Sequence, residues 1–206
     1  MKSMGCIVGA VILGVVLLLG MLGVGTYNGL VGDREAVESQ WAQVESAYQR
    51  RADLIPNLVA TVQGSANFER DTLREVVEAR SRVGQVNAEA SSEILNDPQQ
   101  FARFQEAQDQ LSSALSRLLV VVERYPELRS TQAFQDLMVQ LEGTENRISV
   151  ERNRFNQVAQ GYNTRIQRFP GALLASMFGF QARPYFRSAP GAETAPKVDF
   201  GNPGNR

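Results

Sequence analysis

The chain opens with its longest apolar stretch. Residues from Gly5 to Val24 are almost wholly apolar, and no charged residue stands between Lys2 and Asp33. About 20 such residues cross a bilayer as a helix. This pattern predicts an amino-terminal transmembrane helix. A cleaved signal peptide is the alternative, because the Gly23-Val24-Gly25 run offers small residues at a cleavage position.

Beyond this segment, apolar residues recur three and four positions apart, which is the spacing of one helix face. Only three prolines and four glycines fall between Asp33 and Phe169, which favours helices over short strands. A 3.5-residue apolar repeat is typical of coiled-coil-like bundle packing. Three stripes follow this spacing: Val37, Trp41, Val44, Tyr48, Ile55, Leu58 and Val62; Phe101, Phe104, Leu111, Leu115, Leu118, Val122 and Tyr125; Phe134, Leu137, Leu141, Ile148, Phe155, Tyr162, Ile166 and Phe169.

Local signals predict where the helices begin and end. Asp97-Pro98 combines an N-cap residue with a proline that needs no amide partner at the first helical position. Tyr125-Pro126 predicts the end of that helix, and Ser130 or Thr131 can cap the next one.

Pro56 leaves two interpretations open. It either breaks the first body helix, with Asp53 capping a new one, or kinks a single long helix. A second candidate break lies at Gly64-Ser65.

The predicted fold class is all-α, with an N-terminal transmembrane helix followed by an elongated antiparallel bundle of three to four long helices. At 1.5 Å per residue, a helix from Thr131 to Arg168 would extend roughly 57 Å, so the domain is a rod. The predicted segments are a short cytoplasmic amino terminus (1–4), the transmembrane helix (5–26), the extracytoplasmic bundle (27–169), an apolar carboxyl-terminal segment (170–186) and a tail (187–206) that we expect to be disordered.

The segment 170–186 is unusually apolar for the end of a chain. Its candidate contact residues are Phe178, Phe180, Tyr185 and Phe186. We favour an interpretation in which it folds back over the bundle end. The alternative is an exposed patch for the membrane or for neighbouring subunits.

Small residues in the membrane segment are spaced for helix association. Gly5 and Gly9 form a G-x-x-x-G pair, and Ala10 with Gly14 forms a second small-residue pair. Such pairs let helix backbones approach closely in lipid. Because glycine is also common in membrane helices generally, the pattern suggests oligomerisation without establishing it.

Charged residues interrupt the apolar stripes at two places. Arg51 and Asp53 lie at or near the seam of the first body helix, and Glu145 and Arg152 lie at the seam of the last. Buried charges in a bundle can fix helix register. The alternative is that these long side chains extend outward to water.

Composition excludes several function classes. The chain has 206 residues, 21 Lys plus Arg against 22 Asp plus Glu, no histidine and one cysteine. Without histidine there is no His-based acid–base chemistry and no His-ligated metal site. We find no catalytic motif, expect no cofactor or metal, and expect no nucleic-acid partner from a near-neutral chain.

Cys6 precedes the apolar core from Ile7 to Leu22, whereas the lipid-modified cysteine of a lipoprotein follows such a core. Cys6 therefore does not match a lipoprotein signal.

Several motifs together resemble the LemA family of bacterial membrane proteins, from the anchor to about Phe186. The resemblance implies an amino-terminal membrane helix and an extracytoplasmic helical bundle, and it supplies no catalytic residues. The motifs are Tyr27-Asn28-Gly29-Leu30-Val31, Trp41-Ala42-Gln43-Val44, Tyr48-Gln49-Arg50-Arg51-Ala52-Asp53-Leu54-Ile55-Pro56-Asn57-Leu58-Val59, Glu145-Asn146-Arg147-Ile148, Glu151-Arg152-Asn153-Arg154-Phe155-Asn156, Tyr162-Asn163 and Phe169-Pro170.

These features predict a single-pass protein of the bacterial cytoplasmic membrane. The positive charge of Lys2 places the amino terminus in the cytoplasm and the bundle outside. The leading functional hypothesis is a non-enzymatic scaffold that contacts membrane lipid and forms homo-oligomers. The alternative is an adaptor or regulator of another membrane protein, such as a protease or an envelope-stress sensor.

Overall fold

Helices make up all of the regular secondary structure that the computed structural model describes, which covers residues 2–64, 69–89 and 92–187. Side chains are described at 9, 11–64, 69–86 and 94–187. The predicted all-α class is confirmed. The elements are α1 (Lys2–Gln63), α2 (Arg70–Glu89), the 3₁₀ helix η1 (Ser92–Asn96), α3 (Pro98–Val122), α4 (Pro126–Arg129), α5 (Gln132–Gln167) and α6 (Gly171–Phe178).

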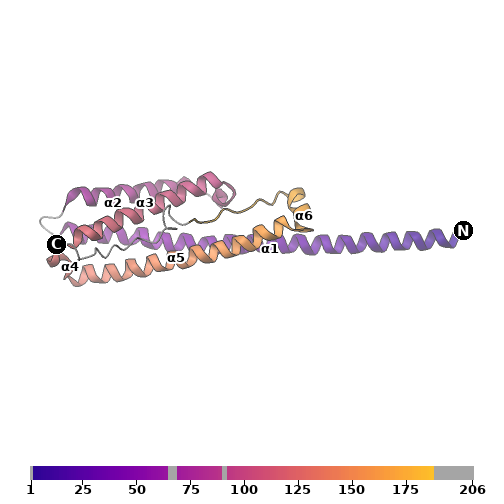
Figure 1. Cartoon of the computed structure of the whole chain (residues 1–206), viewed down its shortest axis with the longest axis horizontal. Coiled ribbons are helices and arrows are strands. Elements are labelled where there is room, and N and C mark those ends of the chain that lie inside the picture. Colours follow the sequence, from indigo (N-terminus) through magenta and orange to yellow (C-terminus); the bar gives the residue numbers. More distant parts are fainter. Residues whose placement is uncertain (1, 65–68, 90–91, 188–206) are drawn as a thin grey trace, which may run out of the picture.

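Four long helices lie side by side in an elongated bundle, and α1 continues far beyond it (Figure 1). Helix α5 packs along α1, and α2 packs along α3. Consecutive long helices run in opposite directions, as short connections require. The short helix α6 lies at the end of the bundle from which the amino-terminal part of α1 projects (Figure 1).

The predicted helix starts are confirmed by the capping contacts. The Asp97 carboxylate accepts hydrogen bonds from the backbone N–H groups of Gln99 and Gln100, at 2.8 and 3.2 Å. These two donors stabilise the charged form and lower the pKa of Asp97. Thr131 caps α5 by accepting a hydrogen bond from the backbone N–H of Phe134.

Pro56 does not break α1, which continues through it to Gln63. Proline lacks an N–H, so the carbonyl of Ala52, four residues earlier, loses its helical donor. The guanidinium of Arg80 on α2 takes that place, with its Nε donating to the Ala52 carbonyl at 3.1 Å. A side chain from the neighbouring helix therefore satisfies the group that Pro56 leaves unpaired.

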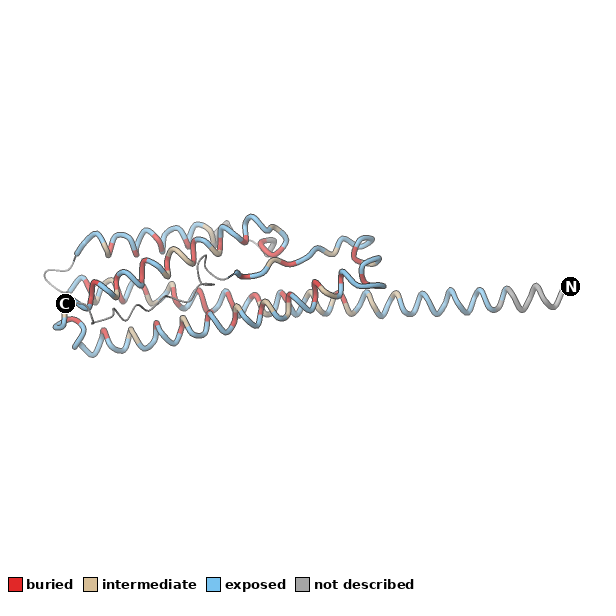
Figure 2. Tube along the Cα trace, viewed as in Figure 1, coloured by how far each residue is buried: buried red, intermediate tan, exposed pale blue. Residues whose placement is uncertain are grey.

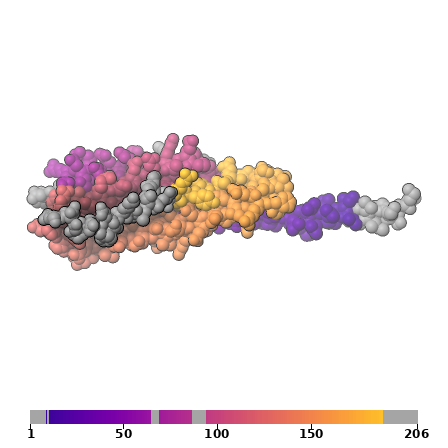
Figure 3. Space-filling model, viewed as in Figure 1, coloured from indigo at the N-terminus to yellow at the C-terminus, as the bar shows by residue number. Residues whose placement is uncertain are grey.

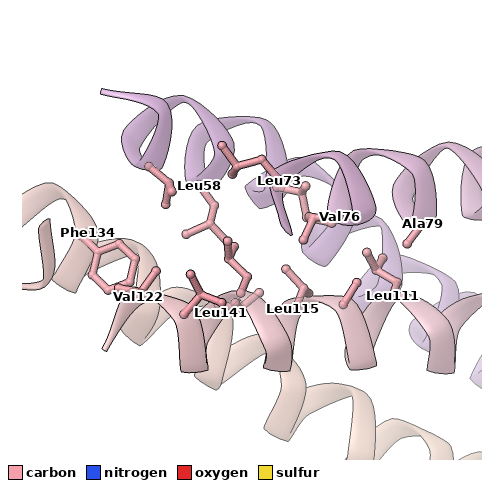
Figure 4. Packing of buried hydrophobic residues seen from close by; sticks show 14 of the residues in the cluster. Leu58, Leu73, Val76, Ala79, Leu111, Leu115, Val122, Phe134 and Leu141 are labelled. Atoms are coloured by element: carbon pink, nitrogen blue, oxygen red, sulfur yellow. The ribbon is translucent and has the colours of Figure 1, made fainter. Parts of the chain in front are cut away.

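The core divides into two clusters along the rod. One, far from the amino terminus, is aliphatic and joins α1, α2, α3 and the start of α5 (Figure 4). The other, nearer to the projecting part of α1, is rich in aromatic rings and includes Trp41, Phe101 and Phe155. Buried positions follow the inner face of each helix along the whole bundle (Figure 2).

Three members of the predicted stripes do not behave as expected. Tyr125 and Leu137 are only partly buried, and Phe169 is 85% exposed. Phe169 lies outside the core because α5 ends at Gln167 and the chain turns away immediately afterwards. Gly171 allows this tight turn, since a Cβ at that position would collide with the carbonyl oxygen of Arg165. The predicted tail lies outside the described residues except for Arg187.

Candidate functional site

The bundle contains a buried polar layer centred on Arg51, whose side chain is 1% exposed. One guanidinium nitrogen donates to the Glu145 carboxylate at 2.8 Å and to the Ser112 hydroxyl at 2.6 Å. The other donates to the side-chain and backbone oxygens of Gln108, at 2.5 and 3.2 Å. Arg51 thus joins α1 to α3 and α5 in one network.

This polar layer separates the two hydrophobic clusters. Along α1, Arg51 follows Tyr48 of the aromatic cluster and precedes Ile55 of the aliphatic cluster. Gln108 and Glu145 occupy the equivalent interruptions on α3 and α5. Because a shift of one helix by a turn would place these polar groups against apolar side chains, the layer favours a single register.

Asp53 and Arg152, the other two polar candidates, do not enter this layer. Asp53 is exposed and accepts a hydrogen bond from Gln49 on the same helix. Arg152 is partly buried and forms an ion pair with Asp109, with 3.5 Å between nitrogen and oxygen. From the sequence we grouped Arg51 with Asp53 and Glu145 with Arg152, each pair on one helix. In the structure, Arg51 pairs with Glu145 and Arg152 with Asp109, between helices.

A second buried charge on α5 was not singled out from the sequence. The Glu151 side chain is 6% exposed and accepts a hydrogen bond from Gln40 of α1 at 2.8 Å. Arg154 lies 3.2 Å away on the same helix and balances its charge. This contact supplies a second polar link between α1 and α5.

An extended strap, residues 180–187, runs back along the bundle from the end of α6. Its backbone is held by side-chain amides from the helices. Asn163 both donates to and accepts from the backbone of Arg183, at 2.8 Å each. Asn156 makes the same pair of bonds with Phe186, at 2.9 Å each. These amides provide the strap with the partners that a neighbouring strand would otherwise supply.

The strap carries Phe186 into the aromatic cluster, where its side chain is buried. Its ring centroid lies 4.8 Å from that of Phe101 and 5.5 Å from that of Phe155. The Arg152 guanidinium lies 4.6 Å from the Phe186 ring and donates to the backbone carbonyl of Arg187. Arg152 therefore helps to fasten the strap to α5.

Arg183 fixes the other end of the strap. Its buried guanidinium forms an ion pair with Glu38 of α1 at 3.1 Å and donates to the side chain of Asn96. It also lies over the Tyr162 ring. The strap consequently contacts α1, α5 and the connection before α3.

The four apolar contact candidates near the carboxyl end have different environments. Phe186 is buried and Phe180 is partly buried, whereas Phe178 is 58% and Tyr185 40% exposed. The Phe178 and Phe180 rings pack edge-on against Tyr27 of α1, with centroids 4.9 and 5.7 Å apart. The segment therefore partly covers the bundle end and partly presents apolar side chains to the outside.

The amino-terminal part of α1 is apolar and exposed on all sides from Val11 to Val24. It belongs to the one helix in the described residues that is long and apolar enough to cross a membrane. A Cβ added at Gly9 or Gly14 would meet nothing within 4 Å. The side chains of Gly5 and Ala10 lie outside the described residues.

Several titratable groups of the bundle pair with side chains on neighbouring helices. Within the described residues, no three acidic or cysteine side chains gather in a way that could bind a metal ion. Burial raises the pKa of the Tyr48 phenol to about 12, although the positive charges of Arg152 and Arg51 oppose this shift. Tyr48 thus stays neutral throughout the physiological range.

Comparison with known proteins identifies the class. A sequence model described as the LemA family matches residues 40–200, so the chain belongs to the LemA family. Magnetosome protein MamQ of Magnetospirillum gryphiswaldense is 30% identical over 182 residues, which cover 82% of this chain and 67% of that protein. Protein LemA of Metamycoplasma hominis is 22% identical over 146 residues, covering 71% of this chain and 62% of that protein.

The sequence signals locate some of these features and miss others. Each member of the polar layer interrupts an apolar stripe, so the gaps themselves mark the layer. The strap amides carry no comparable signal, because asparagine on a helix gives no periodic pattern. Asn156 and Asn163 occur in the motifs that resemble the LemA family, but those motifs do not reveal what the amides bind.

Replacing Arg51 with leucine should destabilise the bundle by about 3 kcal/mol, because the buried oxygens of Gln108 lose their donor. The double variant Arg51→Leu/Gln108→Leu should recover most of that loss. Urea unfolding of the full chain in detergent measures both, and Arg50→Leu on the exposed face is the control. Equal stability of Arg51→Leu and the control would contradict a structural role for the layer.

Raising the pH should destabilise the fold through Tyr48. The phenol titrates near 10 in the unfolded chain and at about 12 in the folded protein. Stability is therefore complete below pH 10 and falls by about 2–3 kcal/mol as pH rises to 12. Tyr48→Phe should reduce this alkaline loss, whereas Tyr185→Phe should retain it. Thermal unfolding at pH 9 to 12 tests this, and identical profiles for wild type and Tyr48→Phe would refute it.

Removing the Asn163 amide should loosen the strap while leaving the helices folded. Asn163→Ala should increase hydrogen exchange at the Arg183 amide by about 10-fold or more, because one hydrogen bond to that amide is lost. Asn153→Ala, at an exposed position on the same helix, is the matched control. Mass spectrometry of the peptide covering the strap gives the readout, and unchanged protection would argue against amide clamping.

Proposed function

We propose that this membrane-associated protein of the LemA family is a non-enzymatic structural or scaffolding protein that self-assembles on the outer face of the bacterial cytoplasmic membrane. The continuity of α1 is the observation that carries this proposal. One helix includes both the exposed apolar segment and the bundle seam, so no flexible linker separates anchor from bundle. A bundle held in this way has a defined orientation to the membrane, which ordered assembly requires.

The anchor also supplies a candidate contact between copies. Gly9 and Gly14 leave open space beside the helix, and backbones can approach closely at such positions. The single positive charge of Lys2 ahead of the apolar segment supports a cytoplasmic amino terminus and an extracytoplasmic bundle. The relatives named as magnetosome proteins carry no reaction in their names, which is compatible with a structural role.

An adaptor for another membrane protein is the second candidate function. A surface groove between α2 and α3 favours it. The groove is lined by acidic side chains, including Glu75 and Asp109, and by basic side chains, including Arg82 and Arg117. Such a surface suits a folded partner with complementary charges better than a small apolar ligand.

If copies associate through the anchor, larger side chains at its small residues should weaken that association. Gly9→Leu/Gly14→Leu should weaken association in lipid by about tenfold, equivalent to about 1.4 kcal/mol. Val15→Phe, which adds volume on a face directed away from both small-residue pairs, is the matched control. Cross-linking at several protein-to-lipid ratios measures the change.

Three outcomes separate the candidate functions. A wild-type chain that stays monomeric at high concentration contradicts the scaffold. A stoichiometric partner recovered from native membranes, together with little self-association, supports the adaptor. Cross-linked oligomers that are lost in the glycine variant and retained in Val15→Phe support the scaffold.

A further inference from the structure

The outward face of α6 is apolar and unusually exposed. Leu173, Met177 and Phe178 are 56, 67 and 58% exposed, and the neighbouring Phe169 is 85% exposed. The opposite face of α6 packs on the bundle through Ala175. We call these four outward side chains the apolar foot. In Figure 2 the helix that bears it is mostly pale blue, at the end of the bundle.

The apolar foot is continuous with the exposed apolar surface of α1. The Phe178 ring packs against Tyr27 with centroids 4.9 Å apart. Phe169 lines a surface hollow together with Met21 and Leu22 of α1. Figure 3 shows this end of the body directly beside the projecting helix. The apolar foot therefore adjoins apolar residues of α1 at two levels, Met21 with Leu22 and Tyr27, although polar residues such as Thr26 also line the hollow.

The level of these contacts along α1 matches the edge of a bilayer. A hydrocarbon core of about 30 Å accommodates the 20 residues from Gly5 to Val24. Met21, beside Phe169, lies three residues inside the end of that segment, which is about 4–5 Å at 1.5 Å per residue. Tyr27, beside Phe178, lies three residues outside it, at the depth where aromatic side chains collect at membrane surfaces.

Charged groups stand just beyond the apolar foot on the side of the bundle. Arg165 and Arg168 line the same hollow as Phe169. Arg165 is paired with Asp33 at 2.8 Å, whereas the exposed Arg168 makes no ion pair among the described residues. An arginine next to apolar side chains that enter a bilayer is well placed to bind lipid phosphate.

We propose that the apolar foot inserts into the outer edge of the same leaflet from which α1 emerges, with Arg168 at the level of the lipid phosphates. The bundle then contacts the membrane at two places, the spanning helix and α6. Two contacts restrict the tilt of the rod, which a single helix does not. This lipid contact is independent of self-assembly, because a single copy contains both parts.

Site-directed spin labelling of the full chain tests the proposal. The only cysteine is first removed by Cys6→Ser, and a nitroxide is placed by Met177→Cys. Val139→Cys is the matched control, because Val139 is 71% exposed and lies near the start of α5, whereas α6 follows the other end of that helix. Each protein is measured as a single copy in nanodiscs of phosphatidylethanolamine and phosphatidylglycerol, with oxygen as the lipid-soluble quencher and a nickel chelate as the aqueous one.

Insertion predicts that the ratio of oxygen to nickel accessibility at position 177 exceeds that at 139 by about tenfold or more, because oxygen concentrates in hydrocarbon and the chelate is excluded. A label at Leu173→Cys should behave in the same way. Equal ratios at 177 and 139 would overturn the proposal. Protection from both quenchers would also overturn it, since that result means that protein covers the foot.

Discussion

Helix α1 joins an exposed apolar segment to the seam of the bundle in one continuous backbone, and the rest of the structure depends on this constraint. From Val11 to Val24 its side chains are exposed on all sides, as lipid contact requires. Leu30 is the first fully buried residue, and from there only one face is apolar. The change occurs within about two turns, around Tyr27. The positions of α5, α6 and the strap are all set by contacts made on the bundle side of that change.

The bundle has a polar layer instead of apolar packing at its middle. A buried arginine costs desolvation energy that leucine would avoid, and only a complete set of partners offsets this cost. Both terminal nitrogens of Arg51 have such partners, contributed by α3 and α5, whereas its buried Nε makes no hydrogen bond. Since the flanking clusters differ, aliphatic on one side and aromatic on the other, a slipped helix would mismatch both the polar layer and the ring packing. The order of three unlike layers along the rod therefore favours one alignment of the helices.

The sequence predicted the helices well, because capping and periodicity are local properties. It placed Asp97 correctly as a cap, offered Thr131 as one of two caps for α5, and identified most of the residues that line the core. It could not pair Arg51 with Glu145, because 94 residues separate them and only the packed bundle sets their alignment. It also assigned Phe169 to the core by extending a stripe past the end of α5. Periodicity describes the face of a helix, but it does not show where that helix itself ends.

The strap runs from the end of the bundle that bears α6 toward this polar layer. It begins next to α6 and ends where Arg187 accepts hydrogen bonds from Arg152 and from Gln105, one turn before Gln108. An extended segment has no internal hydrogen bonds, so in a helical protein its backbone needs partners from side chains. Asn156 and Asn163 supply them from a single helix. Helix α6 is thereby tied to α5 twice, directly through the turn at Gly171 and again through the strap, which makes it a fixed part of the bundle end.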